Sequence, residues 1–408
     1  MKFLKVDSVE TARKKLFTHA QEFISTEALS IDNACGRVLA ENISSLEDIP
    51  SFKRSTVDGY AVLSHDTGAA GDSIPVFLKL KGKVEMGLAT DVVVESGECV
   101  EVPTGGMIPD GADSVVMVEY VESFGEEGKA IYSSVAVGEN VVQIGEDVKK
   151  DQLLLRKGKL LLPSDIGMLA AAGIIDVKVF SRPTMTIIST GDELIYPSVQ
   201  PRIGQIRDVN TYSLTALAEK IGFKVVGKEV LNDDEQILEQ SVTAAMKTSD
   251  IVVVSGGSSQ GEKDKTAEII SRVSKPGVFT HGLAIKPGKP TIIGYDIASK
   301  TLLVGLPGHP VSAMIVFEIL LSWMLRRIHG SSPPLGIPAK IDCNVASSPG
   351  RLTCLPAKLE WVGDSYLATP IFKKSGLIST LSEADGYFTV DRNSEGLTKG
   401  QTVKVYLF

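Results

Sequence analysis

An acid and a glycine-rich loop follow a predicted buried strand, where ligands bind in open α/β sheets. Residues 251–254 are a β-branched run, which ends in Ser255, Gly256 and Gly257. Ser259 and Asp264 follow, before a helix predicted to begin near residue 265. Glycines let backbone N–H groups approach an anion, and a helix N-terminus adds positive potential. An acid there indicates a metal ion or proton transfer; the alternative is a tight connection without a ligand.

Two further loops carry polar groups after or before predicted elements. Asp192 and Glu193 lie in STGDEL, directly after a predicted strand at residues 184–189. Two adjacent carboxylates can hold a hard cation such as Mg²⁺, or they belong to an exposed loop with helix-cap chemistry. Asn210 ends the segment GQIRDVN before a helix predicted over residues 211–221, so it is either a ligand-binding residue or only a helix cap.

Lysines and prolines make up the two remaining loops. Lys286 and Lys289 stand in KPGKP, where each lysine supplies a point charge for a phosphate or oxyanion, unless the pair is merely solvated. Pro307 and Pro310 flank His309 in LPGHP, a rigid turn at a predicted helix start. We expect four of the five loops to meet at one edge of the sheet. This convergence predicts a metal-assisted site for a phosphorylated or oxyanionic ligand.

Alternating strand and helix patterns over residues 184–329 predict the parallel, doubly wound sheet that would position these loops. A helix is expected from Asp7 or Ser8 to about His19, and residues 31–43 have a helix-like pattern. From residue 59 to about 142 the chain has short β segments separated by glycines, which indicate a small β domain, either barrel or sandwich. After Ser331 the pattern is β again, so a further all-β module is expected.

Composition excludes several classes of protein. The net charge of −8 without a long basic run argues against non-specific nucleic-acid binding. The four cysteines lack a CxxC spacing, so zinc knuckles and redox pairs are not indicated, and buried free thiols in a reducing cytoplasm are expected. The N-terminus has no apolar signal region, and the longest apolar stretch, residues 311–325, is too short and interrupted to span a membrane. The motifs GxxxxGK[ST] and GxGxxG are also missing, which disfavours P-loop NTPases and classical dinucleotide-binding proteins.

Taken in order, the segments SxxDGYAV, STGDEL, GQIRDVN, SGGSSQGEKD, AIKPGKP and LPGHPVSA resemble the molybdopterin molybdenumtransferase family, called MoeA in bacteria and also found as the E domain of gephyrin-like proteins. The resemblance covers nearly the whole chain. It implies an elongated homodimer with four domains per subunit. These would be a discontinuous helical–β domain (1–48 and 141–180), an inserted β domain (49–140), an α/β molybdopterin-binding domain (181–330) and a C-terminal β-barrel (331–408).

The resemblance also implies a reaction. Members of the family insert molybdenum from molybdate into the dithiolene of adenylylated molybdopterin, with AMP release assisted by Mg²⁺. A cytoplasmic location follows, without membrane or nucleic-acid partners. The molybdopterin adenylyltransferase and downstream molybdoenzyme chaperones are the expected protein partners. Two alternatives stay open: a molybdopterin carrier or scaffold without insertase activity, and a molybdopterin adenylyltransferase.

Matching motif by motif assigns roles to individual residues. Asp58, Glu193 and Asp264 are the expected catalytic and metal-binding residues. Asp58 lies far in sequence from the α/β domain, and the family's explanation is that this β domain reaches the crevice of the other subunit. The expected substrate-binding residues are Thr104, Asp147, Asp192, Asn210, Asp233, Ser255, Gly256, Gly257, Ser259, Lys286, Lys289, Pro307 and Pro310. Arg351 and Ser375 are weaker matches.

The sequence departs from the family pattern in three places. Gln143 and Ile144 stand before GED, where the family often has arginine, which removes positive charge beside Asp147. His309 replaces the usual asparagine of LPGNP. The glycine loop is more polar than usual but keeps both glycines, Ser259 and Asp264. None of these changes removes a carboxylate, so an active member of the family is expected.

Overall fold

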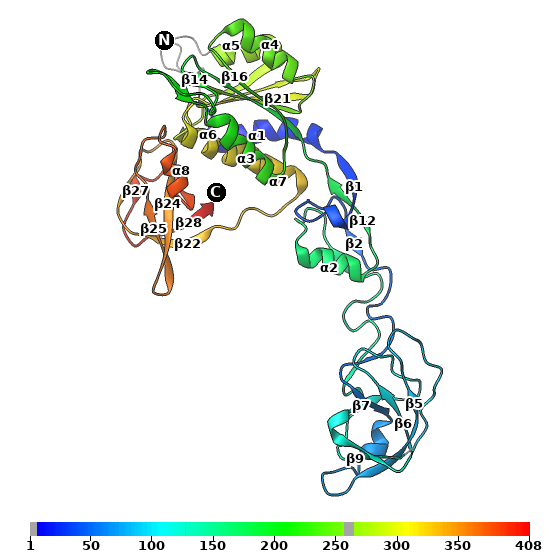
Figure 1. Ribbon diagram of the computed structural model, residues 1–408. Helices are drawn as coiled ribbons and strands as arrows, with labels where there is room; N and C mark the ends of the chain where they lie inside the picture. Colours follow the sequence, from blue (N-terminus) through cyan, green and yellow to red (C-terminus); the bar gives the residue numbers. More distant parts are fainter. Residues whose placement is uncertain (1–5, 127, 257–264) are drawn as a thin grey trace.

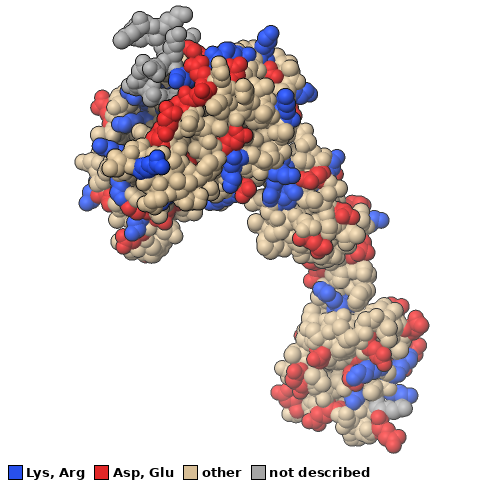
Figure 2. Space-filling model, turned by 45° about the horizontal axis from the view of Figure 1, so that its top comes forward, with Lys and Arg blue, Asp and Glu red and all other residues tan. Residues whose placement is uncertain are grey.

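The computed structural model describes residues 6–126, 128–256 and 265–408. The molecule is extended, with an α/β unit and a C-terminal β unit at one end and a separate β domain at the other (Figure 1). A smaller helical–β unit and a narrow double connection join the two ends. On the face shown in Figure 2, lysine and arginine are interspersed with acidic residues over both lobes.

The α/β unit is built on a six-stranded sheet in the order β16-β13-β17-β21-β20-β18. Its four parallel strands confirm the predicted parallel sheet. The last two strands run antiparallel at one edge and were not anticipated, because their short segments lack the alternation with helices. The strands are β13 (Thr184–Thr190), β16 (Lys224–Leu231), β17 (Ile251–Gly256), β18 (Pro276–His281), β20 (Ile292–Asp296) and β21 (Thr301–Leu306).

Helices cover both faces of this sheet, which explains why its central strands are almost continuously apolar. On one face, Val253 and Val304 pack in a core with α3 (Asn210–Ile221), α6 (Pro310–Phe317) and α7 (Trp323–His329). On the other face, Val252 and Leu303 pack with α4 (Glu235–Ala245) and α5 (Lys265–Val273). The predicted helix over 211–221 is confirmed, and Gly222 ends it in the left-handed conformation, at φ 116°.

The first helix, α1 (Val9–Ala20), is confirmed where the sequence predicted it, with Ser8 Oγ as its cap. Its buried residues belong to the α/β core, and Arg13 donates two hydrogen bonds to the carbonyl of Ile319. That carbonyl lies in a π-helical segment, Glu318–Ser322, which separates α6 from α7. The predicted helix over residues 310–329 is therefore continuous in path but widened at its centre.

The helical–β unit contains α2 (Pro163–Ala171) and two short antiparallel pairs. These are β1 (Thr26–Ser30) with β12 (Asp176–Phe180), and β2 (Ile43–Ser44) with β11 (Leu153–Leu155). The helix-like pattern at residues 31–43 was misleading, since only Ile31–Asn33 form a 3-10 turn. Gly36 adopts φ +77°, which interrupts a right-handed helix, and Leu39 instead hydrogen-bonds to Lys159.

The separate β domain has the strand order β7-β4-β6-β5-β9-β8, which confirms a β fold for this region. Apolar clusters lie on both sides of the sheet, with Val100 in one and Cys99 in the other, as the alternation of a strand requires. The strands are β4 (Gly59–Val62), β5 (Val76–Lys83), β6 (Glu98–Val102), β7 (Ser114–Met117), β8 (Val121–Phe124) and β9 (Gly128–Ile131).

The C-terminal unit is the predicted β-barrel. Five strands follow each other in the order β24-β25-β22-β28-β26, and β26 pairs with β24 to close the ring. A short strand of the α/β unit, β19 (Ile285–Lys286), pairs with β24. The barrel strands are β22 (Ile337–Ile341), β24 (Leu352–Val362), β25 (Ser365–Pro370), β26 (Gly386–Val390) and β28 (Thr402–Leu407). No helix of the described chain is long and apolar enough to cross a membrane.

Candidate active site

The carboxyl ends of β13, β17 and β21 meet at one crevice, as the sequence predicted. Thr190 lies beside Gly256 in the parallel register, and Ser255 lies beside Leu306. The crevice has a volume of about 750 Å³. Of the residues expected to form the site, it brings together Glu193, Asn210, Asp233, Ser255, Gly256, Pro307 and Pro310.

Asn210 ties three of the loops together from the first turn of α3. Its Nδ2 donates to Ser255 Oγ at 2.8 Å and to the carbonyl of Gly308 at 2.8 Å. Ser255 Oγ in turn donates to the carbonyl of Pro307 at 3.3 Å. Asn210 is buried and is not the helix cap, because the preceding residue, Val209, occupies that position. The side chain therefore fixes the LPGHP turn against the end of β17.

The acidic residues form a small network at the opposite side of the crevice. Asp233 accepts a hydrogen bond from Thr190 Oγ1, and its backbone N–H donates to Asp192 Oδ1 at 3.0 Å. Asp192 thus supports the site but does not line the crevice. Glu193 lines it, and its carboxylate folds back over Gly191, where a Cβ would lie 2.8 Å from Glu193 Oε2. The glycine leaves room for an exposed carboxylate at the strand end.

The KPGKP loop stands beside the crevice and contributes Pro290 to its lining. Lys286 and Lys289 are exposed, and neither lines the crevice. The loop is anchored from three directions: β19 pairs with β24, Leu283 hydrogen-bonds to the carbonyl of Lys289, and Ala284 bonds to that of Asp7. The charges of Lys286 and Lys289 are therefore carried by a loop whose backbone is held in place by hydrogen bonds.

Asp58, Thr104 and Asp147 lie outside this crevice. Asp58 precedes β4 in the separate β domain, at the far end of the molecule in Figure 1. Thr104 donates to Asp58 Oδ1 twice, from its N–H at 2.7 Å and from its hydroxyl at 3.0 Å, and these bonds lower the pKa of the Asp58 carboxyl. Asp147 is exposed near the connection to that domain. The structure thus joins Asp58 and Thr104 with each other but not with Glu193.

Three expected residues, Gly257, Ser259 and Asp264, lie outside the described residues. Their neighbour Gly256 is described and has φ +119°. A Cβ there would lie 2.1 Å from the carbonyl oxygen of Thr190, so only glycine fits at this point of the sheet. Within the described ranges, no group of three acidic, histidine or cysteine side chains could hold a metal ion.

The C-terminal barrel unit also reaches the crevice, which sequence reasoning missed. Gly376 and Ile378 line the crevice, and Ser375 Oγ lies 2.8 Å from His309 Nδ1. Arg207 lines it as well and is the positive side chain nearest in sequence to Asn210. The only signal in the sequence was the weak match at Ser375, because contacts between distant modules leave no periodic pattern.

Comparison with known proteins follows the same division of the chain. Residues 7–173 match the model of the MoeA N-terminal region (domains I and II), residues 186–327 that of the probable molybdopterin binding domain, and residues 338–408 that of the MoeA C-terminal region (domain IV). The molybdopterin molybdenumtransferase of Haemophilus influenzae is 31% identical, over 98% of each chain. That of Bacillus subtilis is 30% identical, over 95% of this chain and 91% of the relative.

Solved structures agree. A crystal structure of the molybdopterin biosynthesis MoeA protein from Pyrococcus horikoshii has a TM-score of 0.83 and 37% identity, with 99% of each chain covered. A second structure of the protein from that organism has a TM-score of 0.78 and 32% identity, covering 99% of this chain and all of the other. With three family regions in order, relatives of 30% identity or more over almost the full length and a shared fold, this chain belongs to the MoeA family of molybdopterin molybdenumtransferases.

Proposed function

We propose that this protein is a molybdopterin molybdenumtransferase, which inserts molybdenum from molybdate into the dithiolene of adenylylated molybdopterin and releases AMP. The observation that carries the proposal is the crevice. The ends of β13 and β17 and the first turn of α3 deliver a carboxylate, a glycine-containing backbone and a buried amide to one space of about 750 Å³. A ligand with a polar ring system and phosphates requires such a combination of fixed polar groups and open volume.

The roles within the crevice follow from the contacts. Asn210 holds the LPGHP turn and the end of β17 in place, so it positions the binding surface. Gly256 allows close approach of the backbone, and Arg207 offers a positive charge to a phosphate. Lys286 and Lys289 supply point charges for the oxyanion substrate from the neighbouring loop. Glu193 is an exposed carboxylate that lines the crevice, and we assign the chemical step to it.

Mg²⁺ fits the donor set that the family pattern implies, since carboxylate oxygens are its preferred ligands. Glu193 and Asp264 would hold it, together with Asp58 of a second copy of the chain. When bound, the ion supplies charge stabilisation to the phosphate oxygens at the bond that breaks. The protein would contribute the negative charge that attracts the ion to the crevice.

A homodimer that shares its sites explains why Asp58 and Thr104 are prepared for binding at the far end of one chain. Thr104 orients the Asp58 carboxylate, and both residues are exposed. Met86 and Leu88 are each 59% exposed, and Met86 approaches Gly105, the residue after Thr104. Exposed apolar side chains beside an ordered acid support an interface on this part of the β domain.

Complementation tests the shared site. A chain with Asp58→Ala and a chain with Asp264→Ala should each be inactive as homodimers, because each lacks one member of both sites. Mixed heterodimers should regain activity, since one of their two sites keeps both acids. Proven heterodimers without activity, or an active monomer in light scattering at micromolar concentration, would rule the shared site out.

The cellular setting is part of the proposal. Synthesis of the cofactor places the protein in the cytoplasm, where the molybdopterin adenylyltransferase would supply the adenylylated substrate. Chaperones of molybdoenzymes would take the product. The chain's acidic balance is compatible with protein and small-molecule partners rather than nucleic acid.

The decisive measurement is AMP release from adenylylated molybdopterin with and without molybdate. An insertase releases AMP only when molybdate and Mg²⁺ are both present, and it yields a molybdenum-bearing product. A carrier or scaffold binds the substrate without releasing AMP. An adenylyltransferase instead forms adenylylated molybdopterin when it is incubated with ATP and molybdopterin. Analysis of the products of that incubation identifies this activity.

A further inference from the structure

A second cavity lies at the meeting point of three units, at the carboxyl ends of α3 and α7. Its volume is about 870 Å³. The helical–β unit contributes residues around Arg37 and Lys157, the α/β unit contributes the ends of α3 and α7, and the barrel unit contributes Tyr406 and its neighbours. None of the lining residues belongs to the candidate active site. We call this space the junction cavity.

The junction cavity is strongly basic, although the chain as a whole is acidic. Two of its lining residues are glutamate, Glu219 and Glu318, and seven are lysine or arginine: Arg37, Arg156, Lys157, Lys159, Arg182, Lys220 and Arg326. Like charges held around one space repel each other unless an anion enters. Binding of an anion would therefore relieve the repulsion between these positive side chains.

Existing contacts neutralise only part of this charge. Arg37 pairs with Glu27 at 2.5 Å, Lys159 with Asp165 at 2.7 Å, and Arg326 with Glu318 at 3.3 Å. Lys220 donates one hydrogen bond to a carboxylate oxygen of Phe408, the last residue of the sequence, and its ammonium group has two further N–H donors. The side chains of Arg156 and Arg182 form no hydrogen bond or ion pair with any described residue. Arg156 and Arg182 therefore remain available to an anion, and Lys220 can add its two further donors.

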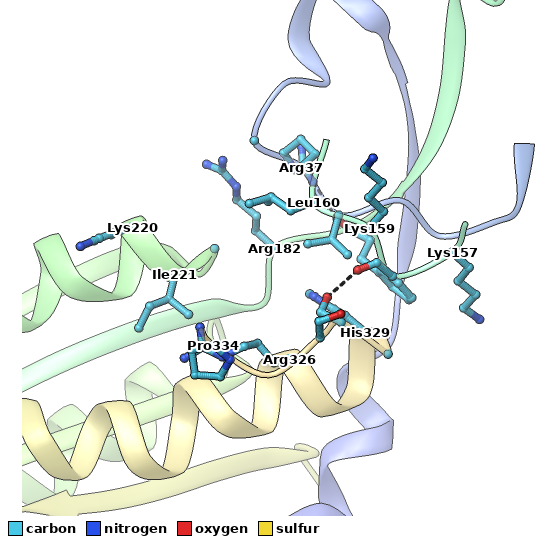
Figure 3. Close-up of a pocket in the computed structure, with 18 of the residues that line it drawn as sticks. Arg37, Lys157, Lys159, Leu160, Arg182, Lys220, Ile221, Arg326, His329 and Pro334 are labelled. Carbon is cyan, nitrogen blue, oxygen red and sulfur yellow. Dashed lines mark hydrogen bonds between the residues drawn. The ribbon is translucent and has the colours of Figure 1, made fainter. Parts of the chain in front are cut away.

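A subset of these groups lies on one side of the cavity. Figure 3 shows Arg182 above Ile221, Arg326 beside Pro334, and Lys220 pointing outward along α3, whereas Lys157 and Lys159 extend away on the other side. Arg182 follows β12, in the connection between the helical–β and α/β units. Lys220 stands near the end of α3, and Arg326 lies in α7. Three charges on different elements thus line the same side of one cavity.

The floor of the cavity is aromatic and rigid. Phe180 stacks on His329 with ring centroids 4.4 Å apart and an interplanar angle of 12°. Burial and the positive charge of Arg37 lower the pKa of His329 to about 4, so this ring is neutral at physiological pH and adds no charge of its own. Ser331 Oγ donates to the carbonyl of Gly158 at 2.8 Å, which closes the floor between two units (Figure 3). The stacked rings and this hydrogen bond therefore hold together the units that carry the positive side chains.

We propose that the junction cavity binds a small molecule carrying phosphate-type oxyanions, through Arg182 and Lys220 with Arg326 beside them. Arginine matches tetrahedral oxyanions with paired N–H donors, and lysine adds a point charge. The volume lies within the range of small-molecule sites. An anion bound there bridges the connection after β12 to α3 and α7, so it also stiffens the junction from which the separate β domain extends.

The test is calorimetric titration of the full-length protein with inorganic pyrophosphate at constant ionic strength. Arg182→Gln and Lys220→Gln should each weaken binding roughly tenfold or more, because each removes a charge-assisted contact. Arg392→Gln is the matched control, since it removes the same charge from an exposed position on the barrel unit, outside the cavity. Equal pyrophosphate affinity in the two cavity variants and the control would overturn the proposal.

A second measurement separates the junction cavity from the crevice, where phosphates also bind in the proposed reaction. Crystals of the full chain soaked in selenate, a tetrahedral dianion, should show an anomalous peak within hydrogen-bond distance of Arg182 and Lys220. Arg207→Gln, which alters the crevice alone, should leave that peak in place. Selenate found only in the crevice would also overturn the proposal.

Discussion

The side-chain amide of Asn210 donates a hydrogen bond of 2.8 Å to Ser255 Oγ, and the same nitrogen donates to the carbonyl of Gly308. One residue at the start of α3 thereby joins the ends of β17 and β21. Because the ligand site lies between these strand ends, its shape depends on a polar contact that is buried and formed by three separate segments.

Asn210→Ala removes both hydrogen bonds and leaves the Gly308 carbonyl and Ser255 Oγ without this donor. Loss of a buried partner costs about 1–3 kcal/mol in the free energy of unfolding. We expect a lower melting temperature and weaker molybdopterin binding, measured by thermal unfolding and by titration. Asn232→Ala, at an exposed position, is the control and should change neither. Unaltered stability and binding in Asn210→Ala would show that the contact has no positioning role.

Gly256→Ala should destabilise the fold itself. The backbone there has φ +119°, and a Cβ would lie 2.1 Å from the carbonyl oxygen of Thr190. Strain and collision together should lower the free energy of unfolding by about 2 kcal/mol or more. Gly87→Ala is the control, because Gly87 also has a positive φ, at +76°, but a Cβ there would meet nothing within 4 Å. Its free energy of unfolding should fall by about 1 kcal/mol. If chemical denaturation shows the same loss of unfolding free energy in both variants, the predicted collision with Thr190 is excluded.

Glu193→Gln and Asp264→Asn keep size and hydrogen-bonding capacity but remove a negative charge. Each should leave molybdopterin bound and slow molybdenum insertion by roughly 10²- to 10⁴-fold, as is typical for loss of an acid–base group. If both residues serve one metal ion, the double variant should be little slower than either single variant. Single-turnover rates measure this, with Glu360→Gln on the exposed barrel hairpin as control. A wild-type rate in Asp264→Asn would remove that residue from the mechanism.

Lys286→Met and Lys289→Met should weaken binding of molybdate or molybdopterin while leaving the melting temperature nearly unchanged. Both lysines are exposed, and exposed charges contribute little to stability. Equilibrium binding and thermal unfolding provide the two readouts. Lys247→Met, on an exposed position far from the crevice, controls for the loss of charge. Unchanged affinity for both ligands in both variants would contradict the assignment.

Thr104→Val should raise the pKa of Asp58 toward its usual range. The backbone N–H of residue 104 still donates to Asp58, but the hydroxyl bond of 3.0 Å is lost. The lowered pKa of Asp58 in the folded protein means that its stabilising contribution is present above the unfolded pKa and is lost as the pH falls through the folded value. Carboxyl NMR titration of both proteins measures the shift. Identical titration curves would show that the hydroxyl does not hold the charge.

Local pattern was sufficient for the elements that position the crevice. The apolar run at residues 251–254 became β17, and the segment 211–221 became α3 with its glycine stop, because burial on two faces or on one face leaves a period in the sequence. The helix predicted over residues 31–43 was wrong because the apolar spacing there has another cause. Their apolar spacing serves pairing with residues 153–161, so a long-range contact imitated a helical pattern.

The sequence by itself determined the family, the order of its units and the loops that hold the acids, amide and lysines of the site. Tertiary structure decided which of these residues meet. It brought Glu193, Asn210 and Gly256 to one crevice because parallel strands end at a common edge, and it kept Asp58 with Thr104 in the separate β domain of the same chain. It also created the junction cavity, whose basic side chains come from three units and are adjacent only after folding.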